Sequence, residues 1–134
     1  MTRLLLPLLL ILAGALPAHA WGKTGHRVTA AVAQTYLSQT ADSAVKDILG
    51  PEGIAEASDW PDFMRSSPDD FWRSDANPYH YVTIPKDTTY SDGTPPQEGD
   101  AITALAKFRT IALDPDAVLE DRQLALRFII HLVG

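Results

Sequence analysis

Apolar residues recur every three or four positions along most of the chain, which is the spacing of helices that bury one face. The pattern predicts a first helix after Gly25, with apolar positions at Val28, Ala31, Val32 and Tyr36. Thr40 can cap a second helix, with apolar positions at Ala41, Ala44, Val45, Ile48 and Leu49. Gly50 and Pro51 end this helix, because glycine accepts the left-handed backbone conformation and proline cannot continue a helix.

Prolines and polar stretches interrupt the middle of the chain. Residues 52–60 can form a short helix, which Pro61 is expected to end because proline removes a hydrogen bond from the helix. Residues 66–78 are polar and contain proline, so they are predicted to be a loop, whereas residues 79–84 have the composition of a strand. Residues 85–99 form a second predicted loop that is rich in Pro, Gly, Thr and Asp.

Two further helices complete the prediction, so the expected fold class is all-α. Asp100 can cap the first, whose apolar positions are Ile102, Leu105, Phe108, Ile111 and Ala112. Asp114-Pro115-Asp116 separates it from a last helix, which is apolar on nearly every side between Leu124 and Val133. A helix without a polar face is expected to be buried all round. Covering helices beyond Gly134 would explain this burial, and the alternative is a small bundle with a hydrophobic tail.

The first twenty residues have the organisation of a secretory signal peptide. Arg3 supplies a positive charge, residues 4–16 are mostly apolar, and residues 17–20 end in an Ala-x-Ala pattern. The apolar run is short for a membrane anchor, which needs about 20 residues. We therefore expect residues 1–20 to be removed, Trp21 to become the N-terminus, and the protein to be secreted or periplasmic.

The composition excludes thiolates as metal ligands. The 134 residues include no cysteine, which excludes a disulfide scaffold, a cysteine-ligated metal domain and a thiol enzyme. The 17 acidic and 11 basic residues give a net charge of −6, which argues against a broad basic surface for duplex nucleic acid. Imidazole and carboxylate groups are the usual zinc ligands in a protein without thiolates.

Three histidines follow the predicted signal peptide, and each has a distinctive setting. His26 ends the segment Trp-Gly-Lys-Thr-Gly-His, His80 lies between two tyrosines, and His131 lies in the apolar last helix. A single histidine is more often a hydrogen-bonded structural residue than a metal ligand. Three histidines in a thiol-free chain rich in carboxylates are more typical of a zinc site.

A carboxylate beside Pro61 is the candidate partner of these histidines. Asp62 follows the proline directly, Asp59 precedes it by two residues, and the sequence alone does not choose between them. Arg65 follows Asp62 by about one helical turn. This arginine could bind an anion beside a metal or form an ordinary surface salt bridge.

The order of these segments resembles a known family. The segments are Trp-Gly-x-x-Gly-His, Ala-Ser-x-Trp-x-Asp-x-x-Arg, Tyr-His-Tyr and Ala-Leu-Arg-Phe-Ile-Ile-His-Leu-Val-Gly. Together they resemble the zinc-dependent, single-strand-specific (type I) nucleases of fungi, plants and bacteria, which share a mostly helical fold with zinc-dependent phospholipases C. The resemblance covers residues 21–134 and implies that they are the N-terminal portion of such a nuclease domain.

The resemblance implies ligands for parts of two of the family's three zinc ions. The α-amine and carbonyl oxygen of Trp21 would bind one zinc together with His26. Asp62, His80 and His131 would bind a second. An α-amine titrates at about pH 8, so it can lose its proton to a metal at neutral pH, provided that cleavage falls directly before Trp21.

The resemblance also implies how the substrate is bound. Arg65 would hold the scissile phosphate, and Tyr81 would stack on a nucleobase, a contact that tolerates any base sequence. Asp62 could orient the attacking water, which zinc activates, so that hydrolysis of single-stranded DNA or RNA leaves 5′-phosphorylated products. The expected partners are therefore single-stranded nucleic acids or nucleotides, and the chain is expected to be a monomer without membrane contact after cleavage.

The chain departs from the family pattern beyond Gly134. The family has an aspartate one helical turn after the last of these histidines, which bridges two zincs, and further histidine and aspartate ligands downstream. We therefore expect little or no nuclease activity from this chain alone. Two other functions stay open. One is a zinc-dependent phospholipase C, against which the Trp-Gly-x-x-Gly-His spacing and the tyrosine after His80 argue. The other is a secreted, non-catalytic zinc-binding helical protein.

Overall fold

The computed structural model describes residues 22–134, so the predicted signal peptide and Trp21 lie outside the described range. Its longer elements are α2 (Lys23–Gln34), α3 (Gln39–Leu49), α4 (Ile54–Met64), α5 (Ala101–Leu113) and α6 (Leu119–Val133). Between α4 and α5 lie a π-helical turn, η1 (Phe71–Asp75), and two 3-10 turns, η2 (Asn77–His80) and η3 (Tyr90–Asp92). The predicted all-α class is confirmed for this part of the chain.

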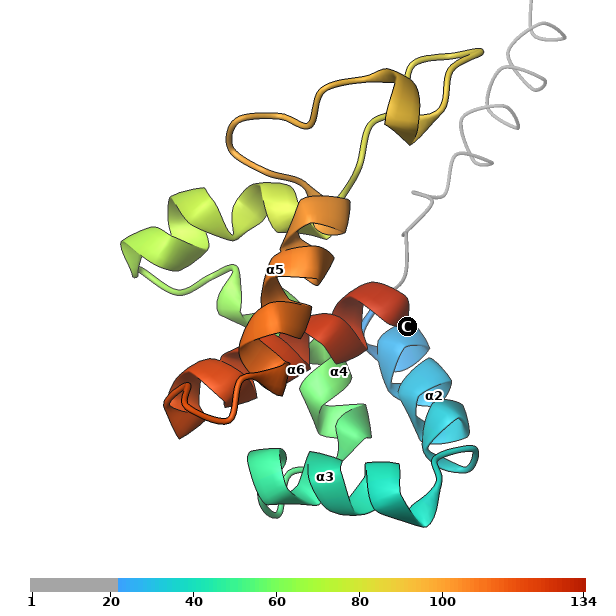
Figure 1. Ribbon diagram of the computed structural model, residues 1–134, viewed down its shortest axis with the longest axis vertical. Coiled ribbons are helices and arrows are strands. Elements are labelled where there is room, and N and C mark those ends of the chain that lie inside the picture. The colour runs from blue at the N-terminus through green and yellow to red at the C-terminus, as the bar shows by residue number, and fades with distance from the viewer. Residues whose placement is uncertain (1–21) are drawn as a thin grey trace, which may run out of the picture.

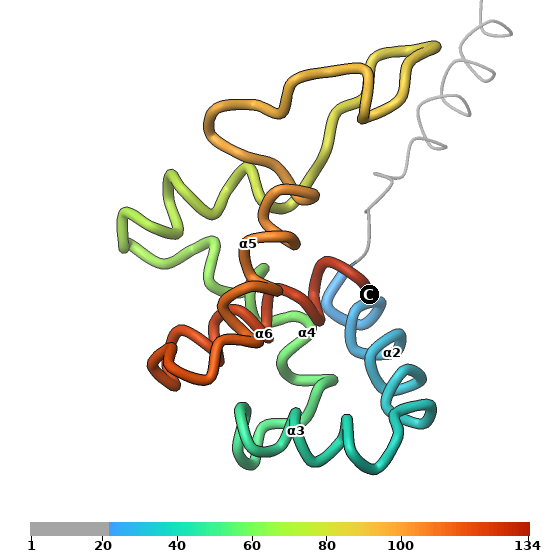
Figure 2. Tube along the Cα trace, in the orientation of Figure 1, coloured from blue at the N-terminus to red at the C-terminus, as the bar shows by residue number. Residues whose placement is uncertain are grey.

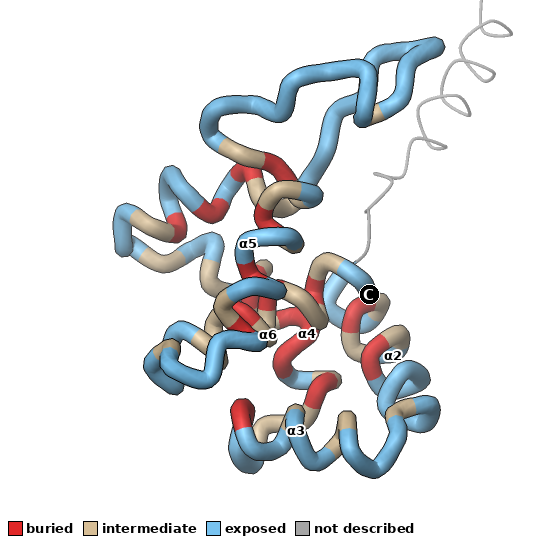
Figure 3. Tube along the Cα trace, in the orientation of Figure 1, coloured by how far each residue is buried: buried red, intermediate tan, exposed pale blue. Residues whose placement is uncertain are grey.

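Helix α6 lies at the centre of the arrangement. It packs against α5, α4 and α3, while α2 packs against α4 (Figures 1 and 2). Every residue of α6 from Arg122 to Leu132 is buried or half-buried, and Figure 3 shows buried residues on α4 and α5 as well as on α6. The predicted burial of this helix is therefore largely confirmed, although Val133 is 68% exposed.

Stacked aromatic rings fill the core between α5, α6 and η1. The rings of Phe108 and Phe128 are nearly parallel with centroids 4.4 Å apart, and Trp72 stacks on Phe128 at 5.6 Å. The alanines buried with these rings are Ala76, Ala104, Ala112 and Ala125. Their small side chains let the helices approach around the rings. Phe128 precedes His131 by one helical turn, so this packing fixes the part of α6 that carries the histidine.

Helix α4 continues through Pro61, although Pro61 was expected to end it. The helix runs to Met64, and Asp62 lies inside it rather than on a bend. Proline in a helix interior removes a hydrogen bond and costs about 3 kcal/mol. Pro61 and Ala57 are both fully buried, so tertiary packing offsets that cost.

The strand predicted for residues 79–84 is wrong, because no strand occurs within residues 22–134. Tyr79 belongs to the turn η2. Tyr81 has an extended backbone with φ of −151°, but its carbonyl accepts a hydrogen bond from the backbone N–H of Ala101 (3.0 Å), at the start of α5. A strand needs a neighbouring extended segment, and a helix occupies that place here. The predicted loop at residues 66–78 likewise contains η1 and the first residues of η2.

Helix α2 begins at Lys23, two residues before the predicted start after Gly25, and its predicted apolar face points to solvent. Val28 and Val32 are more than half exposed, and Tyr36 is 83% exposed. The buried residues of α2 are His26 and Ala30. Periodicity alone therefore predicted the helix correctly and its buried face incorrectly.

Helix ends follow capping chemistry. The second helix is capped by Ser38 rather than Thr40, because the Ser38 hydroxyl accepts a hydrogen bond from the backbone N–H of Ala41 (3.2 Å). Gly50 ends that helix with φ of +66°, a conformation that favours glycine, as predicted. Asp100 caps α5, also as predicted, and its carboxylate accepts from the backbone N–H of Thr103 at 2.8 Å.

Candidate metal centre

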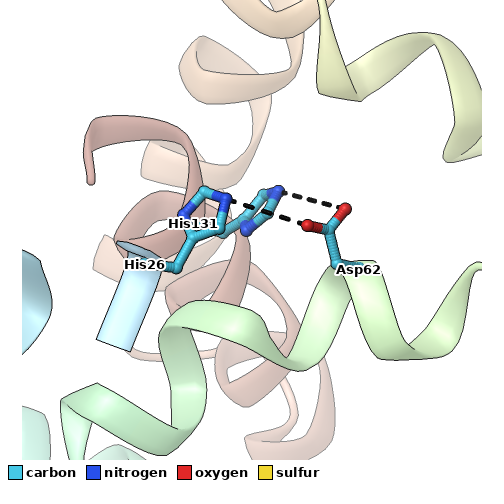
Figure 4. Close-up of side chains that lie close together, drawn as sticks. All are labelled: His26, Asp62 and His131. Carbon is cyan, nitrogen blue, oxygen red and sulfur yellow. Dashed lines mark ion pairs between the residues drawn. The ribbon is translucent and has the colours of Figure 1, made fainter. Parts of the chain in front are cut away.

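Side chains from α2, α4, α6 and η2 converge around Asp62. The Nε2 atom of His26 lies 3.7 Å from Asp62 Oδ2. The Nε2 atoms of His80 and His131 lie 3.8 and 4.0 Å from Asp62 Oδ1. In the subset drawn in Figure 4, ligand atoms of His26, Asp62 and His131 all lie within 4.8 Å of one another. Four of the five predicted metal ligands therefore come together, and the fifth, Trp21, lies outside the described residues.

Each ligand has a defined place in the fold. His26 lies in the first half of α2, Asp62 near the end of α4, His80 at the end of η2, and His131 in the last turn of α6. The rings of His26 and His131 stack with centroids 4.3 Å apart. The three histidines are buried to more than nine-tenths of their side chains, whereas the Asp62 side chain is 34% exposed. The cluster is therefore open to solvent through its carboxylate.

Backbone carbonyls orient two of the imidazole rings. His80 Nδ1 lies 2.9 Å from the carbonyl oxygen of Ala76, and His131 Nδ1 lies 2.8 Å from that of Ser58. A carbonyl oxygen only accepts hydrogen bonds, so each Nδ1 donates, and in the neutral ring Nε2 carries the free lone pair. This arrangement, in which the far nitrogen of each ring is held by a carbonyl, is typical of histidines that bind a metal.

Two buried nitrogens of the cluster lack a partner among the described residues. They are Nε2 of His80 and Nδ1 of His26. The separations of 3.7–4.0 Å around Asp62 exceed hydrogen-bond lengths. Ligand atoms at about 2.0–2.2 Å from a tetrahedral zinc ion would be about 3.4 Å apart, so small side-chain shifts would place an ion between them. The residues present therefore fit zinc.

Burial favours the neutral form of two histidines of the cluster, His80 and His131. Removal from water lowers the pKa of His80, although its hydrogen bond with the Ala76 carbonyl opposes this effect. Burial likewise lowers the pKa of His131, against the opposing hydrogen bond with the Ser58 carbonyl. Imidazole binds a metal only in its unprotonated form, so both rings are suited to metal binding at neutral pH.

The other two predicted site residues border the same cleft. It has a volume of about 500 Å³ and contains His26, Asp62, His80 and His131 together with Arg65 and Tyr81. Arg65 Nη1 lies 3.7 Å from Asp62 Oδ1, and its Nη2 lies 3.5 Å from Asn77 Oδ1, so the guanidinium stands beside the cluster. Tyr81 is 54% exposed and can offer a ring face to a ligand. The remaining wall is mainly apolar and is formed by Val82, Ala101, Leu132, Val133 and Gly134.

The structure distinguishes the two candidate carboxylates. Asp62 faces the histidines, whereas Asp59 is held by Arg27 and Lys23 of α2. The carbonyls of Ser58 and Ala76 could not be predicted from the sequence, because every residue has a backbone carbonyl. The position of Asp59, one helical turn before Asp62, was visible, but its pairing with another helix was not.

The fold and the site together define a class: helical proteins in which histidines and a carboxylate form a cluster that could hold a metal. The family model described as S1/P1 Nuclease matches residues 21–134, and the chain belongs to this family. The predicted resemblance to the single-strand-specific nucleases is thereby confirmed at the level of the family.

Named relatives agree with this membership. Nuclease S1 of Aspergillus oryzae is 27% identical over 125 residues, which cover 87% of this chain and 42% of that protein. Nuclease P1 of Penicillium citrinum is 27% identical over 129 residues, or 85% of this chain and 44% of that protein. Endonuclease 2 of Arabidopsis thaliana is 33% identical over 75 residues, or 54% of this chain and 24% of that protein. The chain therefore spans less than half the length of these relatives.

Within residues 22–134, no helix combines the length and the apolar character needed to cross a membrane.

Proposed function

We propose that this chain is the metal-binding N-terminal portion of an exported, zinc-dependent endonuclease. The proposed reaction is hydrolysis of phosphodiester bonds in single-stranded DNA or RNA, with 5′-phosphorylated products. The observation that carries the proposal is the convergence of three histidine Nε2 atoms on Asp62 in a cleft that also bears Arg65 and Tyr81. Membership of the S1/P1 nuclease family supports the nature of the substrate.

The proposed metal ligands form two sets. Asp62, His80 and His131 would hold one zinc ion, and His26 would hold another with the α-amine and carbonyl oxygen of Trp21. When bound, zinc would supply the Lewis-acid charge that activates a water molecule and neutralises the phosphate. The second set requires residues 1–20 to be a signal peptide that is removed, which is why we propose a secreted or periplasmic protein.

The remaining residues of the cleft would bind and orient the substrate. The exposed Arg65 guanidinium would donate hydrogen bonds to the scissile phosphate, and the Tyr81 ring would stack on a nucleobase. A carboxylate oxygen of Asp62 would accept a hydrogen bond from the attacking water and hold it in line with the phosphorus. The positive charge of Arg65 and of bound zinc would allow a chain of net charge −6 to bind a polyanion at this cleft.

Calorimetric titration with zinc tests the metal centre. We expect the purified chain, with its N-terminal residue established by mass spectrometry, to bind zinc, and Asp62→Asn to weaken that binding strongly. Asp42→Asn is the matched control, since it neutralises a carboxylate on α3 that pairs with Lys46. Equal zinc binding by Asp62→Asn and the unaltered chain would count against the proposed centre.

The activity of the chain alone is a separate question. Because it spans less than half the length of Nuclease S1 and Nuclease P1, we expect little or no hydrolysis of single-stranded DNA even with added zinc. Rapid release of 5′-phosphorylated products by this chain would show that residues 21–134 suffice for catalysis.

A further inference from the structure

Asp59 is a buried carboxylate that the metal centre does not use. It lies on α4 one helical turn before Asp62, and its side chain is only 9% exposed. A buried carboxylate needs compensating charge. That charge comes from a different helix, α2, which also carries His26.

Two cations of α2 bind the two oxygens of Asp59. Arg27 Nη1 lies 3.1 Å from Oδ1, and Lys23 Nζ lies 3.5 Å from Oδ2. The second guanidinium nitrogen of Arg27, Nη2, lies 2.5 Å from Oε1 of Glu56, which is also on α4. The guanidinium therefore joins two carboxylates of α4 to α2 through two separate nitrogens.

This cross-helix pairing lies next to the proposed metal ligands. Arg27 follows His26 directly and Lys23 precedes it by three residues, while Asp59 precedes Asp62 by three. The N-cap of α2 is Gly22, which has no side chain to cap the helix, and the first turn of α2 contains no acidic residue. Contacts with α4, together with the stacking of His26 on His131 of α6, therefore fix that turn.

We propose that Asp59 is a positioning residue: by binding Arg27 and Lys23 it holds the first turns of α2 against α4 and keeps the His26 ring beside Asp62, with Nε2 at 3.7 Å from Oδ2. The inference rests on the proposed metal centre, but it assigns Asp59 a role in alignment and none in ligation. It also distinguishes the two ligand sets, since His80 and His131 come from elements that Asp59 does not pair with.

The chain offers a matched control for Asp59. Glu52 and Arg127 form another partly buried ion pair at 2.6 Å, with side chains 19% and 20% exposed. It joins the segment before α4 to α6. Neutralising the carboxylate of either pair takes an ionic partner from a partly buried arginine and is expected to destabilise the fold. Only removal of the Asp59 pair is expected to move His26.

The test compares Asp59→Asn, Asp59→Glu and Glu52→Gln with the unaltered chain. Affinities for zinc and the visible absorption spectrum of the cobalt(II) form are measured, because the spectrum reports the ligands around the metal. We expect Asp59→Asn to weaken the site that includes His26 by about 10- to 100-fold and to change the cobalt spectrum. Asp59→Glu should retain most of the affinity, and Glu52→Gln should leave affinity and spectrum unchanged even if it lowers Tm. Should Asp59→Asn fail to fold, Arg27→Gln takes its place with the same expected loss.

The outcomes distinguish failure of the positioning role of Asp59 from failure of the proposed function. If the unaltered chain binds zinc and the Asp59 or Arg27 variant binds it equally well, the inference is overturned while the proposed function stands. If the unaltered chain binds no zinc, the proposed function fails, and proton NMR contacts between the stacked rings of His26 and His131 decide the inference. Loss of these contacts in Asp59→Asn alone supports the positioning role, and their persistence overturns it.

Discussion

Each oxygen of the Asp62 carboxylate faces a different set of imidazole rings. Oδ2 faces His26, and Oδ1 faces His80 and His131. The three histidines could be singled out from their residue type and setting in the sequence, whereas the choice of Asp62 over Asp59 depended on the family resemblance. The orientation of the His80 and His131 rings could not be predicted, since it depends on the carbonyls of Ser58 and Ala76, which any residue would supply.

At the residue scale, Arg65 is expected to supply phosphate affinity. A hydrogen bond to a charged group contributes about 1.5–3 kcal/mol, so Arg65→Ala should weaken binding of a short single-stranded oligonucleotide by roughly 10- to 150-fold. Fluorescence anisotropy with the zinc-loaded chain measures this change. Arg73→Ala, which removes an exposed arginine of η1, should have little effect. Equal losses in the two variants would indicate general electrostatic attraction instead of a phosphate site.

Tyr81 is expected to contribute stacking energy that does not depend on base identity. Tyr81→Ala should weaken binding by about 1–3 kcal/mol for thymine-rich and adenine-rich oligonucleotides alike, whereas Tyr81→Phe keeps the ring and most of the affinity. Competition binding with the two oligonucleotides measures the effect. A loss confined to one base, or an equal loss in Tyr81→Phe, would point to a hydrogen bond from the hydroxyl group.

At the scale of elements, most local signals were correct, although the cap of α3 is Ser38 and not the predicted Thr40. Asp100 and Gly50 act at helix ends through their own side-chain or backbone properties, and both were predictable. Pro61 was misjudged because its cost is offset by burial against other helices. Tyr81 was misjudged because a strand depends on a neighbour, and the start of α5 lies there instead.

The cap of α5 leads to a pH-dependent prediction. Burial alone would raise the pKa of Asp100, but hydrogen bonds from the Thr103 backbone N–H, the Tyr90 hydroxyl and the Thr103 hydroxyl hold that pKa below the ordinary 3.8. The ionised cap therefore stabilises the fold above about pH 3.8, and this stabilisation is lost as the pH falls through the lower pKa of the folded state. Asp100→Ala should reduce the free energy of unfolding at pH 7 by about 0.5–2 kcal/mol.

Urea denaturation at several pH values measures this contribution. The difference between the unaltered chain and Asp100→Ala should shrink on acidification below about pH 3.8. Asp100→Asn serves as the control, because asparagine also caps helices but does not titrate. A difference that stayed constant down to pH 2 would mean that the charge of Asp100 does not stabilise the cap.

At the scale of the whole molecule, the burial of α6 could be predicted from the sequence, whereas the buried face of α2 could not. The apolar circumference of α6 correctly indicated its central position. For α2, the periodic positions Val28 and Val32 are exposed, while His26 is buried. Hydrophobic periodicity identifies a helix, but which face is buried depends on partners elsewhere in the chain, here the charged residues and the histidine that face α4.

The aromatic core is expected to carry much of the stability. Phe128 is completely buried and stacks on Phe108 and Trp72. Phe128→Ala should lower the free energy of unfolding by about 3–5 kcal/mol, measured by urea denaturation. Leu113→Ala is the control: this leucine is 76% exposed on α5, so its loss should change stability by no more than about 0.5 kcal/mol. Similar effects of both substitutions would be inconsistent with a core centred on Phe128.

The most direct test of the metal centre is X-ray diffraction from zinc-loaded crystals of the chain, recorded on both sides of the zinc absorption edge. We expect an anomalous peak at about 2.0–2.2 Å from Asp62 Oδ1 and from the Nε2 atoms of His80 and His131. An anomalous map without a peak in this cleft, with the three side chains hydrogen-bonded directly to one another, would rule out the proposed metal centre.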